Sequence, residues 1–312
     1  MTIPNDNPTG DQAAHPRQAT CYNSKYLAEY YDLWIGTWND VELYSRVLAE
    51  MVARNSSDDP VRVLDVGTGS GRITHGLATA QQQQQQQQQE QGGKLQPAVH
   101  FLGLDNEQHM LDRARSLTDP AHVDQITWVL GSAEDLVSLP ALQNPAGGPG
   151  GIIDMIVFAC GSICHFHEPA QGHRFFEQIA KVLKPTTGRA YISVLEALTD
   201  GGEQLGRALE PSEPILMPSK EFPGIMYRET WPMHKLIGNV WHTNRHIVVS
   251  QKSSDGQETI VEDNMDLRKI KVWTEADMRA YATAAGLEVV QILHHQNDST
   301  HKELIFVLGT LA

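Results

Sequence analysis

The segment Val63-Leu-Asp-Val-Gly-Thr-Gly-Ser-Gly-Arg72 decides the fold of this chain. It overlaps the run Val61–Val66, which is short, apolar and rich in β-branched residues, and which therefore predicts a buried strand. Glycines at 67, 69 and 71 then predict a tight turn, and residues 72–80 continue with a helical pattern. The segment is a strand, a glycine turn and a helix, with Asp65 near the end of the strand.

The spacing of these glycines disfavours two nucleotide-binding turns. A dinucleotide fingerprint requires G-x-G-x-x-G, but Arg72 stands where the third glycine belongs. The P-loop pattern is absent as well, because no Gly-Lys-Ser/Thr follows. The glycines still permit a ligand to approach the backbone closely at the carboxyl edge of a sheet.

Outward from this turn, apolar runs alternate with helical segments, which is typical of parallel βαβ units. The further predicted strands are residues 100–105, 126–130, 152–159, 189–195, 287–293 and 303–308. The main predicted helices are residues 107–117 and 169–183, together with one that begins at Thr274 and is followed by Asp277 in a capping-box pattern. The sequence thus predicts an α/β fold, a Rossmann-like, mostly parallel sheet of seven strands with helices on both faces.

The remaining segments predict the domain organisation. Residues 1–20 have the composition of a disordered tail. The core comprises residues 21–196 and 270–312. It begins with two helices, the second capped by Asn39 or Asp40, and contains a glutamine-rich insertion at 81–98 that we expect to extend the preceding helix. Residues 197–269 predict an antiparallel cap inserted after the fifth strand, with strands near 226–233, 240–250 and 259–269, and we expect this cap to select the substrate.

Composition limits the classes of partner. The chain has 24 basic and 38 acidic residues and a formal charge of −14, which disfavours nucleic acid and anionic membranes, because both require a basic face. It has no run of 18 apolar residues, no secretory signal and no metal-binding motif. Three cysteines are too few for a disulfide framework, so we expect a cytoplasmic protein. The oligomeric state stays open.

The pattern Asp65-x-Gly-x-Gly-x-Gly71, followed by Asp105 at the end of the second strand, resembles the first motifs of class I S-adenosylmethionine-dependent methyltransferases, in particular their small-molecule branch. The resemblance covers about residues 24–196 and 270–312. It implies S-adenosyl-L-methionine as the cofactor and a small molecule as the methyl acceptor. It also implies that Asp105 binds the two ribose hydroxyls and that the loop 131–136 holds the adenine.

The resemblance implies a set of cofactor-binding residues, namely Tyr31, Asp65, Gly67, Thr68, Gly69, Asp105, Asn106, Met110, Ser132, Ala133, Glu134 and Ala159. Some of them have a second interpretation. Asp105, Gly67 and Gly69 either bind the cofactor or only form the turns at the ends of their strands. Asp65 either binds the cofactor or stabilises the turn, and Met110 either contacts the adenine or belongs to the core. Tyr31 either closes over the methionine moiety or docks its helix on the core. Arg72 either reaches the methionine carboxylate or is solvated.

The adenine loop departs from the family pattern, because Ser132 stands where an aspartate is common. The contact to the adenine amino group is then expected from Ser132, Glu134, Asp135 or the backbone.

The loop Phe158–His165 after the fourth strand indicates the chemistry. It lacks the Asn/Asp-Pro-Pro-Tyr/Phe signature of enzymes that methylate bases or amides, which again disfavours DNA. His165 is the candidate catalytic base, with a packing histidine as the alternative, and Cys160 is expected in the core or in the pocket wall. We therefore expect methyl transfer to N or O of a small molecule, in specialised metabolism. The alternatives are a cyclase or isomerase on the same fold, or a non-catalytic regulatory protein that binds the cofactor.

Overall fold

The computed structural model describes residues 16–18, 20, 22–36, 38–55, 57, 59–92, 97–144, 151–199, 213–253, 255–297 and 301–311. Within these ranges, no helix combines the length and the apolarity that a membrane span requires.

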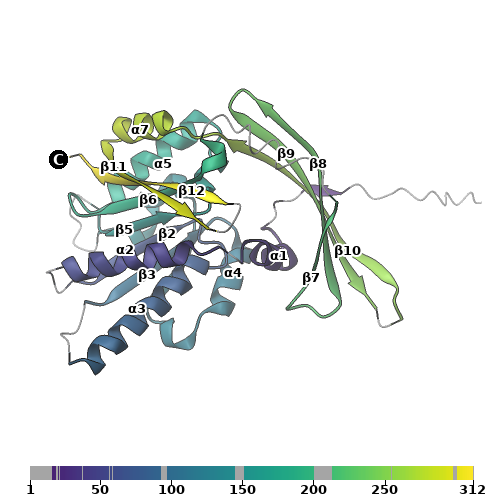
Figure 1. Cartoon of the computed structure of the whole chain (residues 1–312), viewed down its shortest axis with the longest axis horizontal. Helices are drawn as coiled ribbons and strands as arrows, with labels where there is room; N and C mark the ends of the chain where they lie inside the picture. Colours follow the sequence, from purple (N-terminus) through teal and green to yellow (C-terminus); the bar gives the residue numbers. More distant parts are fainter. Residues whose placement is uncertain are drawn as a thin grey trace, which may run out of the picture.

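The core is a seven-stranded sheet in the order β11-β12-β6-β5-β2-β3-β4 (Figure 1). Five strands run parallel: β2 (Val61–Val66), β3 (Val99–Asp105), β4 (Ile126–Leu130), β5 (Met155–Phe158) and β6 (Arg189–Leu195). The last two, β11 (Leu287–Gln296) and β12 (Lys302–Thr310), form a hairpin that joins β6 in antiparallel orientation. The predicted α/β fold with a mostly parallel seven-stranded sheet is confirmed.

Helices cover both faces of this sheet. On one face, α2 (Asp40–Arg54) and α3 (Arg72–Glu90) bury residues such as Leu48 and Leu77. On the other, α5 (Pro169–Val182) and α7 (Glu275–Ala284) bury residues such as Phe176 and Met278. α4 (Gln108–Leu117) follows β3, and short 3₁₀ turns fill several connections, including η2 (Ala133–Ser138) and η4 (Ser162–His165). Because the central strands are covered on both sides, they are apolar almost throughout.

The helix ends test the predicted caps. The capping box of α7 is confirmed, because Thr274 and Asp277 each bond the backbone amide of the other. The predicted cap of α2 is wrong. Asn39 occupies the N-cap but makes no side-chain capping bond, and Asp40 instead binds Arg72.

The glutamine tract continues a helix, as expected. α3 runs without interruption from Arg72 through residues 81–89 to Glu90. Gln81 is buried and Gln82 bonds His122, whereas most later glutamines are half-buried or exposed. The rest of the predicted insertion includes residues 93–96, which lie outside the described residues.

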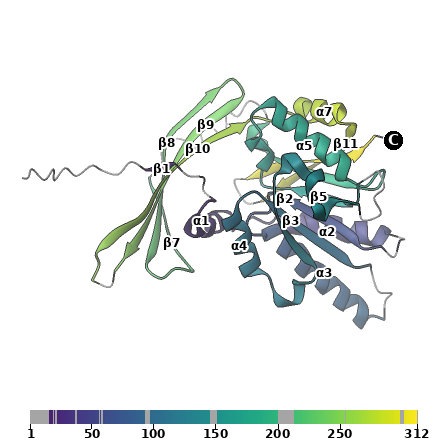
Figure 2. The ribbon, with the colours of Figure 1, turned by 180° about the vertical axis from the view of Figure 1, so that it is seen from behind.

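A second sheet stands beside the core in the order β1-β10-β9-β8-β7 (Figure 2). Its long antiparallel strands are β8 (Ile225–Ile237), β9 (Val240–Lys252) and β10 (Glu258–Lys271), which confirms the three strands predicted for the cap. The edge strands β1 (Arg17–Gln18) and β7 (Ile215–Pro218) were not predicted. β1 falls within the predicted disordered tail, yet it pairs with Asn264 and Met265 of β10, whereas residues 1–15 and 19 lie outside the described residues.

Helix α1 (Lys25–Ile35) lies between the core and the second sheet (Figures 1 and 2). Leu27 and Tyr30 of α1 pack on Tyr227 and Ile247 of the sheet. Beneath this contact, Glu229 accepts hydrogen bonds from the Tyr30 hydroxyl and from the Arg245 guanidinium, and all three side chains are buried. The joint between the sheet and α1 therefore has an apolar cluster and a buried ion pair.

Candidate active site

The glycine turn between β2 and α3 brings the backbone to the floor of the site. Gly67, Gly69 and Gly71 all have positive φ, which residues with a Cβ adopt at a cost. A Cβ on Gly71 would lie only 2.5 Å from the Trp128 ring. A Cβ on Gly69 would instead point at Tyr31 and Met110, which line the cavity described below. Trp128 thus packs against the turn at Gly71, whereas the backbone at Gly69 is accessible from the cavity.

Asp65 holds this turn from inside. Its carboxylate is 3% exposed and accepts hydrogen bonds from the hydroxyls of Thr68, at 2.6 Å, and Thr74, at 2.8 Å. Burial raises its pKa to about 6, against the effect of these two hydroxyls. Asp65 and Thr68 do not line the cavity, so of the two interpretations of Asp65 the geometry supports the stabiliser of the turn.

Asp105 ends β3 and joins two loops at the carboxyl edge of the sheet. One carboxylate oxygen accepts the Gly69 amide at 2.8 Å, and the other accepts the Glu107 amide at 2.9 Å. Burial raises the pKa of this carboxyl, and the amides of Glu107 and Gly69 oppose the shift. A carboxylate has roughly four acceptor sites, so these bonds leave capacity for ligand hydroxyls.

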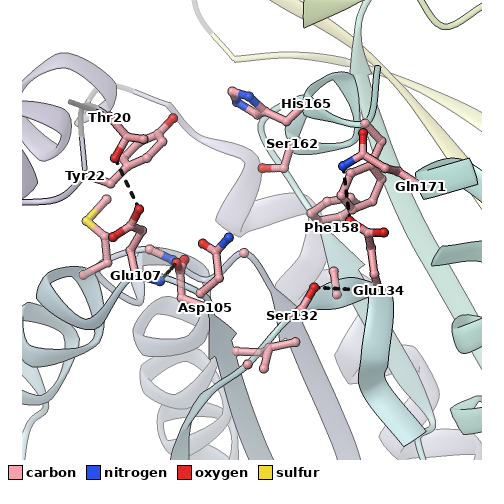
Figure 3. Close-up of a pocket in the computed structure, with 18 of the residues that line it drawn as sticks. Thr20, Tyr22, Asp105, Glu107, Ser132, Glu134, Phe158, Ser162, His165 and Gln171 are labelled. Carbon is pink, nitrogen blue, oxygen red and sulfur yellow. Dashed lines mark hydrogen bonds between the residues drawn. The ribbon is translucent and has the colours of Figure 1, made fainter. Parts of the chain in front are cut away.

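A cavity of about 360 Å³ lies over these groups, within the range of a small-molecule site (Figure 3). Nine of the predicted cofactor residues line it: Tyr31, Gly67, Gly69, Asp105, Asn106, Met110, Ser132, Ala133 and Glu134. His165 lines it too. Asp65, Thr68 and Ala159 do not, and Ala159 is instead buried in the core on the α2 side. The site predicted from sequence is therefore largely brought together in one place.

Other lining residues were missed, namely Thr20, Tyr22, Leu104, Glu107, Gly131, Phe158, Ser162, Phe166 and Gln171. Some carried a signal, because Gly131, Phe158 and Ser162 belong to the two loops that the sequence had already singled out. Thr20 and Tyr22 carried none, since they reach the cavity from the far N-terminal segment. There Thr20 donates to Glu107, and the Tyr22 ring packs edge-on against Tyr31 at 5.3 Å.

The loop after β4 carries the side chains that were considered for the adenine contact. The Ser132 hydroxyl accepts the Glu134 amide at 3.1 Å and so caps η2. The Glu134 carboxylate binds Gln171 and Arg174 from α5. Asp135 does not line the cavity. Ser132 and Glu134 keep acceptor capacity beside these bonds, so both stay candidates for the contact to the adenine amino group, together with the backbone.

His165 enters the cavity from η4, close to Ser162 (Figure 3). His165 lines the cavity and is exposed. Loss of bulk water and the positive charge of Arg268 lower its pKa to about 4, with Asp266 opposing. The imidazole is therefore neutral at physiological pH and a weak base.

Both interpretations of Arg72 are wrong, because it does not line the cavity and its side chain is engaged inside the protein. Its guanidinium pairs with Asp40, which is fully buried, and also donates to the Cys160 sulfur at 3.1 Å. Burial raises the pKa of the Cys160 thiol, so this cysteine is protonated and unsuited to act as a nucleophile. Arg72 thereby ties α2 to the turn after β5.

Comparison with known proteins places this site in a family. Residues 57–215, just over half of the chain, match the family model described as "Methyltransferase domain". An N-methyltransferase from Cladobotryum sp, FrzE, is 29% identical over 282 residues, which cover 88% of this chain and 93% of that protein.

Two solved structures share the fold. The sugar N-methyltransferase KedS8 from Streptoalloteichus sp ATCC 53650 superimposes with a TM-score of 0.59 at 14% identity, covering 100% of this chain and 99% of its own. The amino pentose methyltransferase CalS10 from Micromonospora echinaspora gives 0.56 at 16% identity, covering 94% and 100%.

The chain therefore belongs to the methyltransferase-domain family and is a class I S-adenosylmethionine-dependent methyltransferase, with S-adenosylmethionine as its cofactor. The cavity fits this molecule. Asp105 offers a half-buried carboxylate for hydroxyls, Phe158 and Leu104 offer an apolar wall for a purine, and the open backbone at Gly69 admits a polar tail.

Proposed function

We propose that the chain transfers the methyl group of S-adenosylmethionine to a nitrogen atom of a small-molecule amine. The observation that carries this choice is that His165, the candidate base in the cavity, has no carboxylate partner among the described residues to orient or activate its ring, and its lowered pKa agrees with this. A hydroxyl acceptor benefits from a base that removes its proton, whereas the lone pair of a neutral amine attacks without one. The name of the Cladobotryum relative supports the same choice.

The residues of the cavity have separate tasks in this proposal. Asp105 and the backbone at Gly67 and Gly69 hold the cofactor, which supplies a methyl group activated by the positive sulfonium. The neutral imidazole of His165 accepts a hydrogen bond from the amine N–H, and so directs the nitrogen lone pair. Holding both partners in line supplies most of the rate enhancement in such a displacement.

The setting of the reaction is part of the proposal. KedS8 and CalS10 act on a sugar and an amino pentose by their printed names, and CalS10 is described as involved in calicheamicin biosynthesis. We propose specialised metabolism for this chain on that basis. We also propose a cytoplasmic location, which its low cysteine content supports, and the cap sheet as the part that selects the acceptor.

The direct test compares matched acceptors. The protein is incubated with S-adenosylmethionine and pairs of small molecules that differ only in an amine or a hydroxyl, and S-adenosylhomocysteine and methylated product are both quantified by mass spectrometry. We expect methylation of amines and little of the matched alcohols. Faster methylation of the alcohols would overturn the nitrogen assignment. Binding without any turnover would favour the regulatory alternative.

Replacing His165 tests its task. We expect His165→Ala to lower kcat roughly tenfold, the effect of one lost hydrogen bond in the cavity, and His165→Gln to retain most of the activity, because its amide oxygen also accepts. Both variants should keep the pH dependence of the wild type between pH 6 and 8, since an imidazole with a pKa of about 4 stays neutral there. A loss of roughly a thousandfold would instead show that His165 removes a proton.

A further inference from the structure

A buried carboxylate outside the cavity is connected to its wall. Glu303, the second residue of β12, is 1% exposed and lies at the carboxyl edge of the sheet, because β12 runs antiparallel to β6 and pairs there with Leu195. One of its oxygens accepts the Ser193 hydroxyl at 2.8 Å, and the other accepts the Asn297 amide at 2.7 Å. None of these three residues lines the cavity.

Ser193 connects Glu303 to the turn after β5 by a second hydrogen bond. Its hydroxyl oxygen accepts the backbone amide of Gly161 at 3.0 Å. Cys160 and Gly161 both have positive φ, and Cys160 is one of two non-glycine residues with that conformation among the described residues. A non-glycine residue in this region persists only where its surroundings hold it. The turn leads directly into η4, which carries Ser162 and His165 into the cavity wall.

We propose that Glu303 is a positioning residue: acting through Ser193, it holds the Cys160–Gly161 turn that presents Ser162 and His165 to the cofactor. An ionised Glu303 can only accept hydrogen bonds. It therefore obliges the Ser193 hydroxyl to donate toward β12 and leaves that oxygen free for the Gly161 amide. A protonated Glu303 can donate to the same oxygen, so the Ser193 proton is no longer held toward β12 and can turn toward the Gly161 amide, which weakens that bond. The proposal rests on the cofactor site described above.

The protonation state of Glu303 changes near neutrality. Burial raises its pKa to about 7, against the hydrogen bonds from Asn297 and Ser193. The charged and titratable groups that face it are Asp40 and Tyr44 from α2, Arg72 from α3, Cys160 from the turn, Cys164 from η4 and its cross-strand neighbour His295 from β11. Asp40 raises the pKa and Arg72 lowers it. The turn should therefore be held more firmly at pH 8 than at pH 6.

The variant Glu303→Gln removes this titration with little change of shape. Its amide oxygen still accepts from Ser193. Its new N–H group faces the Asn297 amide nitrogen, so the Asn297 amide must turn over; its oxygen, which is buried and has no hydrogen-bond partner among the described residues, then accepts from the glutamine. Ser193→Ala breaks the connection to Gly161 from the other side. Glu288→Gln, at an exposed glutamate of β11, is the matched control.

The test measures binding of S-adenosylhomocysteine by calorimetry from pH 6 to pH 8. We expect the wild type and Glu288→Gln to bind roughly threefold to tenfold more tightly at pH 8, the effect of one altered hydrogen bond. Glu303→Gln and Ser193→Ala should lose most of this dependence. If Glu303→Gln keeps it, another group such as Asp65, whose pKa is about 6, is responsible, and the proposal is wrong. A wild type whose affinity for S-adenosylhomocysteine is the same at pH 6 and pH 8 would also refute the proposal.

If S-adenosylhomocysteine does not bind at all, the cofactor site itself is refuted. Two measurements without ligand test the role of Glu303 independently of that outcome. Hydrogen exchange of the peptide around Gly161, corrected for intrinsic rates, should be faster at pH 6 than at pH 8 in the wild type, and equal at both in Glu303→Gln. The free energy of unfolding of the wild type should instead be lower at pH 8 than at pH 6. Because the folded-state pKa lies above the usual 4.5, the contribution of Glu303 to folding is present below pH 4.5 and lost as the pH rises through 7. Glu303→Gln should therefore gain stability at pH 8. Equal exchange at both pH values in the wild type would overturn the positioning role.

Discussion

Replacing Asp105 by alanine should weaken binding of S-adenosylhomocysteine by at least a hundredfold. Hydrogen bonds to a charged group contribute about 1.5–3 kcal/mol each, and two ribose hydroxyls would be lost together. The variant also removes the acceptor of the Gly69 amide, so the turn itself loses its connection to β3. Calorimetry at pH 7.5 measures the change directly.

Two controls make this result specific. Asp105→Asn keeps the shape but can accept only through one oxygen, so it cannot serve the amides of Gly69 and Glu107 together, and we expect an intermediate affinity. Asp112→Ala changes an exposed aspartate of the following helix and should bind like the wild type. An Asp105→Ala protein that is folded and retains wild-type affinity would refute the assignment of Asp105 to the ribose.

Replacing Arg245 by methionine should lower the free energy of unfolding by about 3–5 kcal/mol, because it leaves a buried carboxylate without its cation. The side chain of Glu229 is 0% exposed and that of Arg245 is 2% exposed, so water cannot take over the lost interaction. The Tyr30 hydroxyl still donates to Glu229, but a hydroxyl does not neutralise the charge. Urea denaturation followed by fluorescence gives the free energy.

The same experiment separates charge from packing. The double variant Arg245→Met with Glu229→Leu removes both charges and should recover most of the lost stability, since apolar pairs of similar volume often replace buried ion pairs at little cost. Arg228→Met, on an exposed position of the same sheet, should change stability by less than about 0.5 kcal/mol. A destabilisation of Arg245→Met no larger than that of Arg228→Met would show that the buried pair does not stabilise the joint with α1.

The core sheet and the cofactor edge could be predicted because their signals are local. The glycine turn and the strand that ends at Asp105 each lie within about ten residues of sequence, and parallel strands place their carboxyl ends together whatever the loops do. The chemistry of Asp65 was less accessible, because only the fold shows that its carboxylate faces Thr68 and Thr74 rather than the cavity.

The features that escaped prediction depend on contacts between distant segments. Tyr22 reaches the cavity only because the N-terminal segment passes between α1 and β10. Glu303 meets Ser193 because the last strand returns antiparallel beside β6, which places residues 110 positions apart in hydrogen-bond contact. The two-residue strand β1 has no pattern that could be recognised without its partner β10. Periodicity describes one segment at a time, so pairings of this kind stay invisible to it.

The glutamines of α3 form a region in which we expect the length to change without moving the residues that line the cavity. The helix starts at the glycine turn, beside the cofactor, and its glutamine half projects beyond the sheet at the opposite end (Figure 1). Repeats of a single residue gain and lose units readily when DNA is copied. Added glutamines would lengthen the outer end of α3 by about 1.5 Å each, while the first turn and Asp65 stay in place. Copying errors in this tract would therefore produce proteins of different length with the same active site.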